Sequence, residues 1–455
     1  MSFPAHIFKA YDIRGLADTE LSTDLAYDLG RAFVVLLQRR GVDRQGKKIV
    51  VGWDMRPTSI DYAQALVRGI QDEGLAVVTI GLASTPLFNF TCAHYPEHAG
   101  GIMVTASHNP AQFNGFKLTY NTGLPVGKDT GMNELRDLVE KKEWSEKKNA
   151  VVEEFSPLAD YLTRVFRLVD KKRIQPKKIV IDAGNGMAKV TFLELIKDLP
   201  LEVEYLFLEP DGRFPNHEAN PLKTETLQAL QKKVVETGAD FGFALDGDAD
   251  RIGLVDEKGQ VVPASFVGGL VGLEILKKNP GSLLWYDLRL SRAVVEKWEA
   301  MGAKTGMTPV GHANIKKIMK EKGGQFAAEL SLHLYYHDMY DLESPELSLL
   351  FFLELLSQSD KPLSALWSEL DQYANPGEIN FEVENKERVL QVLKEKYHDA
   401  VINDLDGLLF TYPDFWFNVR LSNTEPLLRL NLEAQTREIM QKKLQEISQI
   451  IKENG

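Results

Sequence analysis

The sequence predicts an α/β protein with three similar mixed α/β domains built on βαβ units, followed by a C-terminal α+β domain with an antiparallel sheet. The chain has 455 residues, which is enough for three or four domains of about 100–150 residues. Three segments repeat the order strand, turn, helix, strand, which is typical of parallel sheets covered by helices. The last segment instead joins neighbouring strands by short turns, which indicates antiparallel pairing.

The first repeat covers Lys47–Gly81. A β-branched run ends in Gly-Trp-Asp, apolar residues such as Ile60, Ala63 and Ile70 then recur at helical spacing, and Gly74 ends the predicted helix. The run LAVVTI is expected to form a second buried strand.

The other two repeats start at Lys177 and Gly281. In the second repeat we expect Val190, Leu193 and Ile196 to share one helix face. Ligands of such sheets bind at the carboxyl ends of the strands, so the loops after the strands are where site residues are expected.

The C-terminal part begins near Gly377. It reads as a strand (INFEV), a helix (KERVLQVLKEKYH), three strands (LLFTY, FWFNVRL and LLRLNLEA) and a long amphipathic helix. The expected domains are 1–150, 151–257, 258–370 and 371–455.

Composition excludes several classes of protein. The 44% apolar and 26% charged content is ordinary for a globular chain, and no apolar run approaches the roughly 18 residues of a membrane span. The net charge of −12 argues against nucleic-acid and acidic-membrane partners, although local cations can still bind a small anion. The single cysteine, Cys92, and a start without a secretory pattern favour the cytoplasm.

The first candidate loop is TASHNPAQFNGFK, Thr105–Lys117. Asn and Pro suit a turn, and Ser107 can be read as a turn residue as well. A serine-hydrolase site is disfavoured, because there is no G-x-S-x-G motif and the adjacent His108 is poorly placed to act as the base.

The second candidate loop lies in FGFALDGDADRIGLVD. Asp246, Asp248 and Asp250 can converge on one side of a turn, and their oxygens favour Mg²⁺ or Ca²⁺ over zinc. An EF-hand is an alternative, but Arg251 stands where that loop needs glycine, and a strand precedes it. An acidic turn without a metal stays open.

The third candidate is QFAAELSLHLYYHD, in which Glu329, Ser331 and His333 alternate. On a strand this spacing puts all three side chains on one face, where they suit neighbouring sugar hydroxyls. A solvated strand face is the alternative.

The fourth candidate is the turn in NVRLSNTEPLLRLNL. Arg420, Ser422, Asn423 and Thr424 could bind a phosphate through an Arg fork and successive N–H groups. A polar hairpin turn explains the same residues. Together, a serine, a carboxylate cluster, a sugar-type strand and a phosphate clamp favour phosphoryl transfer.

The ordered set FKAYDIRG, TASHNP, DGDADR, ELSLH and RLSNTEP resembles the α-D-phosphohexomutases, specifically the phosphomannomutase/phosphoglucomutase group, over essentially the whole chain. The resemblance implies four domains around a central cleft and interconversion of hexose 1-phosphate and hexose 6-phosphate of mannose or glucose. It also implies a phosphoserine at Ser107, a hexose 1,6-bisphosphate intermediate, Mg²⁺ as cofactor, hexose phosphates as small-molecule partners, and a monomer or small homo-oligomer.

The resemblance assigns residue roles as well. The catalytic residues would be Ser107, His108, Lys117 and Arg251, with His108 and Lys117 as acid/base helpers. The Mg²⁺ ligands would be Ser107, Asp246, Asp248 and Asp250. The sugar 3- and 4-hydroxyls would be held by Glu329 and Ser331. The phosphate that is not transferred would be held by Arg420, Ser422, Asn423 and Thr424. Further cleft positions are Tyr11, Arg14, Arg289 and His312, in addition to Lys117 and Arg251.

The chain departs from the family pattern in the sugar loop, where Leu332 stands at the position expected for glycine. Arg289 stands where lysine is more common in the family, and Lys9 stands where arginine is more common. These departures bear on substrate choice, so a glucosamine phosphate mutase on the same scaffold stays open. A sugar-phosphate-binding protein without catalysis is a further alternative and predicts binding without phosphoserine.

Overall fold

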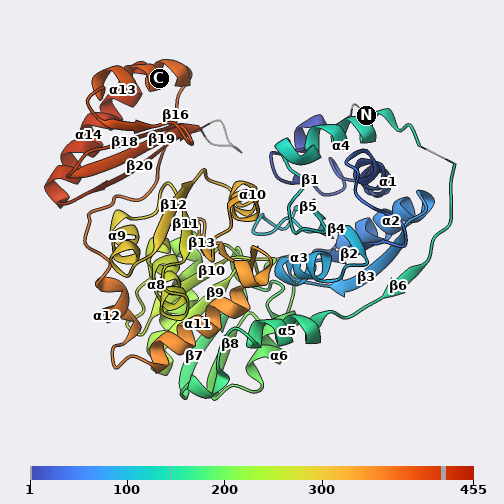
Figure 1. The fold of residues 1–455 in the computed structure, drawn as a ribbon, viewed down its shortest axis with the longest axis horizontal. Coiled ribbons are helices and arrows are strands. Elements are labelled where there is room, and N and C mark those ends of the chain that lie inside the picture. Colours follow the sequence, from blue (N-terminus) through green and yellow to red (C-terminus); the bar gives the residue numbers. More distant parts are fainter. Residues whose placement is uncertain (1–2, 145, 422–426) are drawn as a thin grey trace. The chain divides into compact units, whose positions relative to one another are not determined.

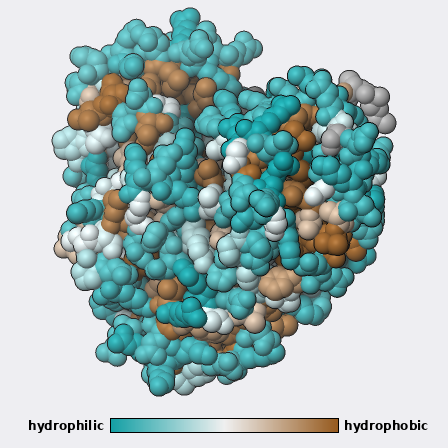
Figure 2. Space-filling model, turned by 45° about the vertical axis from the view of Figure 1, so that its right-hand side comes forward, coloured by the Kyte–Doolittle hydropathy of each residue, from teal (hydrophilic) through white to brown (hydrophobic). Residues whose placement is uncertain are grey.

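The computed structural model describes residues 3–144, 146–421 and 427–455 (Figure 1). The chain divides into two compact units, Met1–Val262 with Ser331–Ser364, and Pro263–Leu330 with Ala365–Gly455. Figure 2 shows one face of the molecule, on which hydrophilic residues cover most of the surface and hydrophobic residues form smaller patches. Among the residues that the structure describes, no helix is both long and apolar enough to span a membrane.

The first sheet, in the first unit, has the strand order β1-β5-β4-β2-β3-β6. Its strands are β1 (Ile13–Leu16), β2 (Lys48–Trp53), β3 (Ala76–Leu82), β4 (His98–Val104), β5 (Phe113–Tyr120) and β6 (Val152–Glu154). The accompanying α-helices are α1 (Thr23–Arg39), α2 (Ser59–Asp72), α3 (Thr85–His94) and α4 (Asn133–Lys141). Strand β2 pairs parallel with β3 and β4, whereas β5 pairs antiparallel with β4 and β1. The predicted βαβ unit is therefore β2-α2-β3.

The second sheet, also in the first unit, has the order β10-β9-β7-β8. Its strands are β7 (Lys177–Asp182), β8 (Leu201–Leu206), β9 (Phe241–Leu245) and β10 (Ile252–Asp256). The α-helices of this region are α5 (Leu158–Phe166), α6 (Lys189–Ile196), α7 (Gln228–Thr237) and, from the later segment of the unit, α11 (Pro345–Ser357). Strands β7 and β8 pair parallel around α6, as predicted. The short strands β14 (Leu334–Tyr336) and β15 (Leu342–Glu343) pair antiparallel.

The second unit contains the third βαβ unit, in which β11 (Leu283–Asp287) and β12 (Lys304–Thr308) pair parallel around α9 (Arg292–Ala300). Strand β13 (Phe326–Ala328) pairs parallel with β11 on its other side. Helices α8 (Ala264–Lys278) and α10 (His312–Lys322) belong to the same part, and α12 (Leu363–Ser368) follows later in the chain.

The last sheet, in the second unit, is fully antiparallel, with the order β16-β20-β19-β18-β17. Its strands are β16 (Ile379–Glu382), β17 (Val401–Asn403), β18 (Leu408–Thr411), β19 (Phe415–Leu421) and β20 (Leu427–Ala434). The two α-helices are α13 (Lys386–Lys396) and α14 (Arg437–Asn454). The predicted fold class is confirmed in its three mixed α/β parts and its antiparallel C-terminal part. Within the C-terminal part, β17 is a strand that the pattern missed.

The helix faces differ in detail from the prediction. Ile60 is 46% exposed, because α2 packs through its other face, where a Cβ at Gly69 would lie 2.1 Å from the carbonyl oxygen of Tyr27 on α1. In α6, Phe192 and Leu195 are fully buried, whereas Val190 and Leu193 are only half-buried. In helices such as these, the spacing of apolar residues does not by itself reveal which side meets the core.

The predicted strand across residues 329–333 is wrong, because these residues form a turn between β13 and β14. Strand β13 ends at Ala328, and Leu332 has a φ of 70°, in the left-handed region, which an extended strand does not contain. The expected alternation of Glu329, Ser331 and His333 on one face therefore does not apply.

Candidate functional site

Ser107 lies in the loop between β4 and β5, in the first unit. It has a φ of 51° and is 1% exposed. Its N–H donates to Thr105 Oγ1 at 2.9 Å, its Oγ donates to Asp246 Oδ2 at 2.9 Å, and its Oγ lies 3.1 Å from His108 Nδ1. The backbone thus turns the hydroxyl toward the carboxylate loop.

Arg56, which follows β2, anchors the loop that carries Ser107. Its buried guanidinium is held by Asp54, with Nε 3.2 Å from Oδ2. The guanidinium donates to four carbonyl oxygens of the loop, those of Ser107 (2.9 Å), Asn109 (2.6 Å), Pro110 (2.8 Å) and Phe113 (2.8 Å). Five hydrogen bonds on one buried side chain, four of them to the loop, make this loop a rigid platform.

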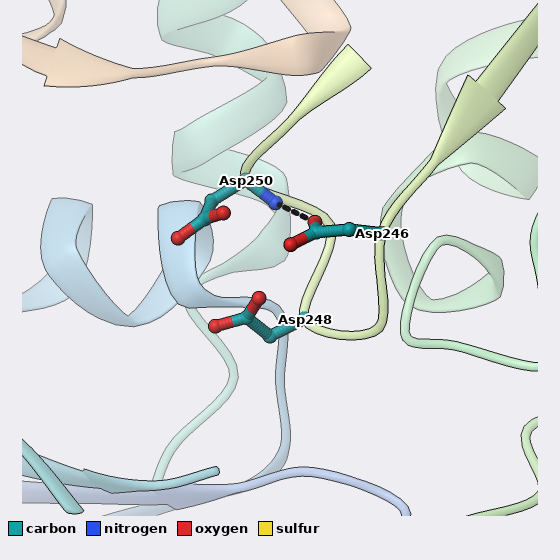
Figure 3. A group of neighbouring side chains, drawn as sticks. All are labelled: Asp246, Asp248 and Asp250. Carbon is teal, nitrogen blue, oxygen red and sulfur yellow. Dashed lines mark hydrogen bonds between the residues drawn. The ribbon is translucent and has the colours of Figure 1, made fainter. Parts of the chain in front are cut away.

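The three aspartates lie in the loop between β9 and β10, in the same unit (Figure 3). They are buried, and one ligand oxygen from each lies within 4.8 Å of the others. Asp246 Oδ1 accepts the backbone N–H of Asp250 at 3.0 Å, which closes the loop (Figure 3). A Cβ at Gly247 would lie 2.4 Å from the carbonyl oxygen of Ser107, so the two loops approach as closely as glycine permits. The antiparallel strands on both sides exclude an EF-hand.

The aspartate oxygens fit a hard cation. Lys117 Nζ donates to Asp248 Oδ2 at 2.6 Å and to Asp250 Oδ2 at 2.7 Å, and Thr85 Oγ1 donates to Asp248 Oδ2 at 2.6 Å. Asp248 Oδ1 is buried and has no hydrogen-bond partner among the described residues. A buried carboxylate oxygen without a donor is strongly unfavourable unless a cation binds it, so this triad could hold a metal.

The electrostatics of the cluster point the same way. Burial, followed by repulsion from Asp250 and Asp248, raises the pKa of Asp246 well above its ordinary value. Burial alone would lower the pKa of Lys117, but the carboxylates of Asp248 and Asp250 outweigh it and raise that pKa. Burial, and then the charges of Arg251 and Arg14, hold the pKa of His108 well below its ordinary value, so its imidazole is neutral.

His333 joins the carboxylate loop to the turn that carries Ser331, within the first unit. Its Nε2 lies 3.3 Å from Asp250 Oδ1 and accepts from Arg251 Nε at 3.3 Å, and its Nδ1 lies 2.8 Å from Ser331 Oγ. The carbonyl of Leu332 accepts the N–H of Ile252 at the start of β10. The metal loop and part of the predicted sugar loop are therefore neighbours.

Arg14 on β1 also reaches the serine loop. Its Nε donates to Asp12 Oδ2 and its Nη1 to Asn109 Oδ1, both at 2.7 Å. Tyr11 is half-buried just before this strand. The first unit thus brings together Ser107, its neighbours and most of the predicted cationic side chains.

The second unit holds the other predicted residues. Glu329 is buried, and its Oε1 accepts the N–H of Gly311 at 3.0 Å, next to His312, the first residue of α10. Arg289 donates to both oxygens of Asp287, from Nε at 3.0 Å and from Nη2 at 2.8 Å. Arg289 and Arg420 meet at Glu378, which the sequence did not single out. The predicted residues Ser422, Asn423 and Thr424 lie outside the described residues.

Two buried residues, Arg56 and Thr85, and the partly exposed Glu378 escaped the sequence analysis. Arg56 had a weak signal, because Asp54-Met-Arg directly follows a strand, where site residues are expected. Thr85 and Glu378 had none, since their partners are far away in the chain.

Family models match the chain in four consecutive segments. They are described as phosphoglucomutase/phosphomannomutase alpha/beta/alpha domain I (residues 5–146), domain II (159–259), domain III (266–373) and C-terminal domain (378–450). Together they cover most of the chain.

Curated proteins and a solved structure agree with these matches. A phosphomannomutase of Methanocaldococcus jannaschii is 36% identical over 450 residues, covering 98% of this chain and 97% of that protein. A phosphomannomutase of Escherichia coli K12 is 36% identical over 94% of each chain. A phosphoglucomutase/phosphomannomutase family protein of Burkholderia thailandensis superposes with a TM-score of 0.90 at 30% identity, covering 99% of this chain and 98% of the other.

Proposed function

Because the chain belongs to the phosphoglucomutase/phosphomannomutase family and is a hexose phosphate mutase, we propose that Ser107 carries the phosphoryl group that is transferred to and from the hexose phosphate. The observation that carries the proposal is the bond from the buried Ser107 Oγ to Asp246 Oδ2 at 2.9 Å. A turn residue has no need to lie beside three carboxylates, whereas a phosphoserine needs the cation that these carboxylates would bind, because that cation neutralises its charge.

In the proposed reaction, the bond from phosphorus to Ser107 Oγ breaks as a bond forms to a hydroxyl oxygen of the hexose phosphate. The proton of that hydroxyl passes to a base, for which the neutral imidazole of His108 is suited. Lys117 keeps its proton and acts as a cation beside the transferring group. The hexose 1,6-bisphosphate then gives its other phosphoryl group to Ser107 by the reverse steps.

We further propose that Asp246, Asp248 and Asp250, with the phosphoserine, hold Mg²⁺, which would neutralise negative charge during transfer. The orphan oxygen Asp248 Oδ1 supports a cation at this place. Arg251, with Nε 3.7 Å from Asp246 Oδ2, adds positive charge on the same side.

The proposed substrates are mannose phosphates first and glucose phosphates second, because the curated relatives named above are phosphomannomutases. We propose that Glu329 and Ser331 bind the sugar hydroxyls. Further substrate contacts would come from His333, Tyr11 and His312. The phosphate would be bound by Arg289, Arg420, Ser422, Asn423 and Thr424. Glucosamine phosphate is the third candidate substrate, because Leu332 places a buried side chain in the left-handed region where the family pattern has glycine.

We propose that the protein lies in the cytoplasm and that it is a monomer or a small homo-oligomer. The domain boundaries near residues 150, 257 and 370 remain a prediction from the sequence.

The experiment measures phosphate on Ser107 by mass spectrometry and the conversion of mannose 1-phosphate with Mg²⁺ and a trace of hexose 1,6-bisphosphate. Ser107→Ala should lose nearly all turnover and still bind mannose 6-phosphate, while Ser368→Ala, at an exposed serine, should behave as wild type. An active, unphosphorylated protein would disprove the phosphoserine mechanism. Comparing rates on glucosamine 1-phosphate decides between the substrates, and binding without any turnover would favour the non-catalytic alternative.

A further inference from the structure

Glu378, just before β16, lies at the centre of a group of arginines in the second unit. Its carboxylate faces Arg289 Nη1 at 3.5 Å, Arg420 Nη2 at 3.4 Å and Arg429 Nη1 at 3.2 Å. Asn431 Nδ2 donates to it at 3.3 Å. The side chains of Arg289 and Arg420 are 7% and 3% exposed, so this is a built site and not a surface ion pair.

The carboxylate satisfies these arginines poorly. Charge-assisted N–H···O bonds usually measure about 2.7–2.9 Å, and every contact of Glu378 is longer. The Nε of Arg420 is buried and has no hydrogen-bond partner within the described part of the chain. A buried guanidinium donor that is left unmatched, beside long contacts to the others, indicates a site made for a larger anion with more oxygens.

The charges support the same reading. Asp287 already binds Arg289 through both oxygens, and Glu378 faces the charges of Arg420 and Arg429. Asp406 adds a weaker attraction to Arg420. Burial and then the charge of Arg289 lower the pKa of Arg420, which is the response of a cation with too little negative charge nearby. Burial alone would raise the pKa of Glu378, but the arginines outweigh it and lower that pKa, so Glu378 is ionised at neutral pH.

We propose that Glu378 is an internal placeholder for the phosphate of the hexose substrate. Its carboxylate occupies the anion position between Arg289, Arg420 and Arg429 and yields that position when phosphate binds. Glu378 therefore keeps the arginines in place and lowers their affinity for phosphate, which lets a phosphosugar leave the site and bind again in its other orientation. The inference rests on the proposed role of Arg420 in holding the phosphate that is not transferred.

The test measures the dissociation constant of mannose 6-phosphate by calorimetry on the full chain. Glu378→Gln keeps the shape and removes the competing charge, so we expect binding at least about fivefold tighter than in wild type. Glu378→Asp withdraws the carboxylate by one methylene group and should give a smaller gain in the same direction. If the glutamine variant does not fold, the aspartate variant decides the question alone.

Two controls separate this effect from a general change of charge. Glu382→Gln removes an exposed carboxylate at the other end of the adjoining strand, β16, and should leave the dissociation constant unchanged. Unphosphorylated mannose should show no gain with any variant. Unchanged or weaker binding of mannose 6-phosphate by the Glu378 variants, or an equal gain for free mannose, would overturn the inference. Failure of the phosphoserine mechanism would appear instead as absence of phosphate on Ser107, a readout independent of these binding constants.

Discussion

Replacing Arg56 by methionine should disturb both the stability of the protein and its catalytic loop. The guanidinium donates to four carbonyl oxygens of the loop that carries Ser107 and lies against Asp54, and both charged side chains are completely buried. Methionine has a similar length but no donors. The substitution therefore leaves the carbonyls without partners and Asp54 without its counter-charge.

The structure sets the size of the effect. Breaking a buried ion pair by removing one partner costs about 3–5 kcal/mol. Asp54 keeps the hydroxyl of Ser59 at 2.6 Å, which offsets part of the loss. We expect the free energy of unfolding to fall by about 3 kcal/mol, measured by urea denaturation. Turnover should fall by about a hundredfold, because the loop no longer holds Ser107 in position.

Arg213 provides the matched control. Asp211-Gly-Arg213 has the same spacing as Asp54-Met-Arg56, and Arg213 also bonds its aspartate, but the side chain of Arg213 is 79% exposed. Arg213→Met should leave stability and turnover unchanged, because exposed ion pairs contribute little. If both variants behave alike, or if Arg56→Met loses less than about 1 kcal/mol and keeps its turnover, then the anchoring role given to Arg56 is wrong.

Three further predictions follow from single contacts. Leu332 is buried at a φ of 70°, so Leu332→Gly relieves backbone strain that Leu332→Ala keeps, and in denaturant unfolding the glycine variant should be the more stable of the two by about 1 kcal/mol. Thr85→Val removes the hydroxyl that orients Asp248 at 2.6 Å, so the Mg²⁺ concentration for half-maximal turnover should rise about tenfold. Burial opposes protonation of His217, but its bond to Asp182 at 3.0 Å outweighs burial and raises the pKa above 6.5. The charged form of His217 then stabilises the fold at low pH, and this stabilisation is lost as pH rises through the folded-state pKa. In wild type the melting temperature should therefore fall between about pH 6 and 8, and in His217→Gln this fall should be smaller.

Each of these has an outcome that would count against it. An alanine variant of Leu332 as stable as the glycine variant would mean that the left-handed backbone carries no strain. A Thr85→Val protein with wild-type Mg²⁺ dependence would show that Lys117 alone positions Asp248. A pH slope that persists without the imidazole of His217 would assign it to other groups.

Local pattern was sufficient for most of the secondary structure. The runs that became β2, β7 and β11 are short and apolar, and the helices that follow them have apolar residues at helical spacing, so their order alone predicts parallel pairing. The loops of Ser107 and the three aspartates were singled out because their residue types suit phosphoryl transfer and metal binding, and because their motifs resemble those of the phosphohexomutases. Residues 329–333 gave a wrong prediction. Their polar side chains alternate as in a strand, but Leu332 adopts the left-handed backbone conformation, which the pattern of side chains does not reveal.

What the sequence determined by itself is the order of the elements, the fold class and the places of the serine and aspartate loops between strands, since each depends on residues that are close together in the chain. Only the tertiary structure placed Arg56 under the Ser107 loop, Thr85 against Asp248 and Glu378 among the arginines. These contacts join residues separated by 42 to 163 positions in the chain. The physical reason is that a buried charge or hydroxyl is stable only beside its partner, and the partner is selected by how the strands and helices pack, which no local pattern specifies.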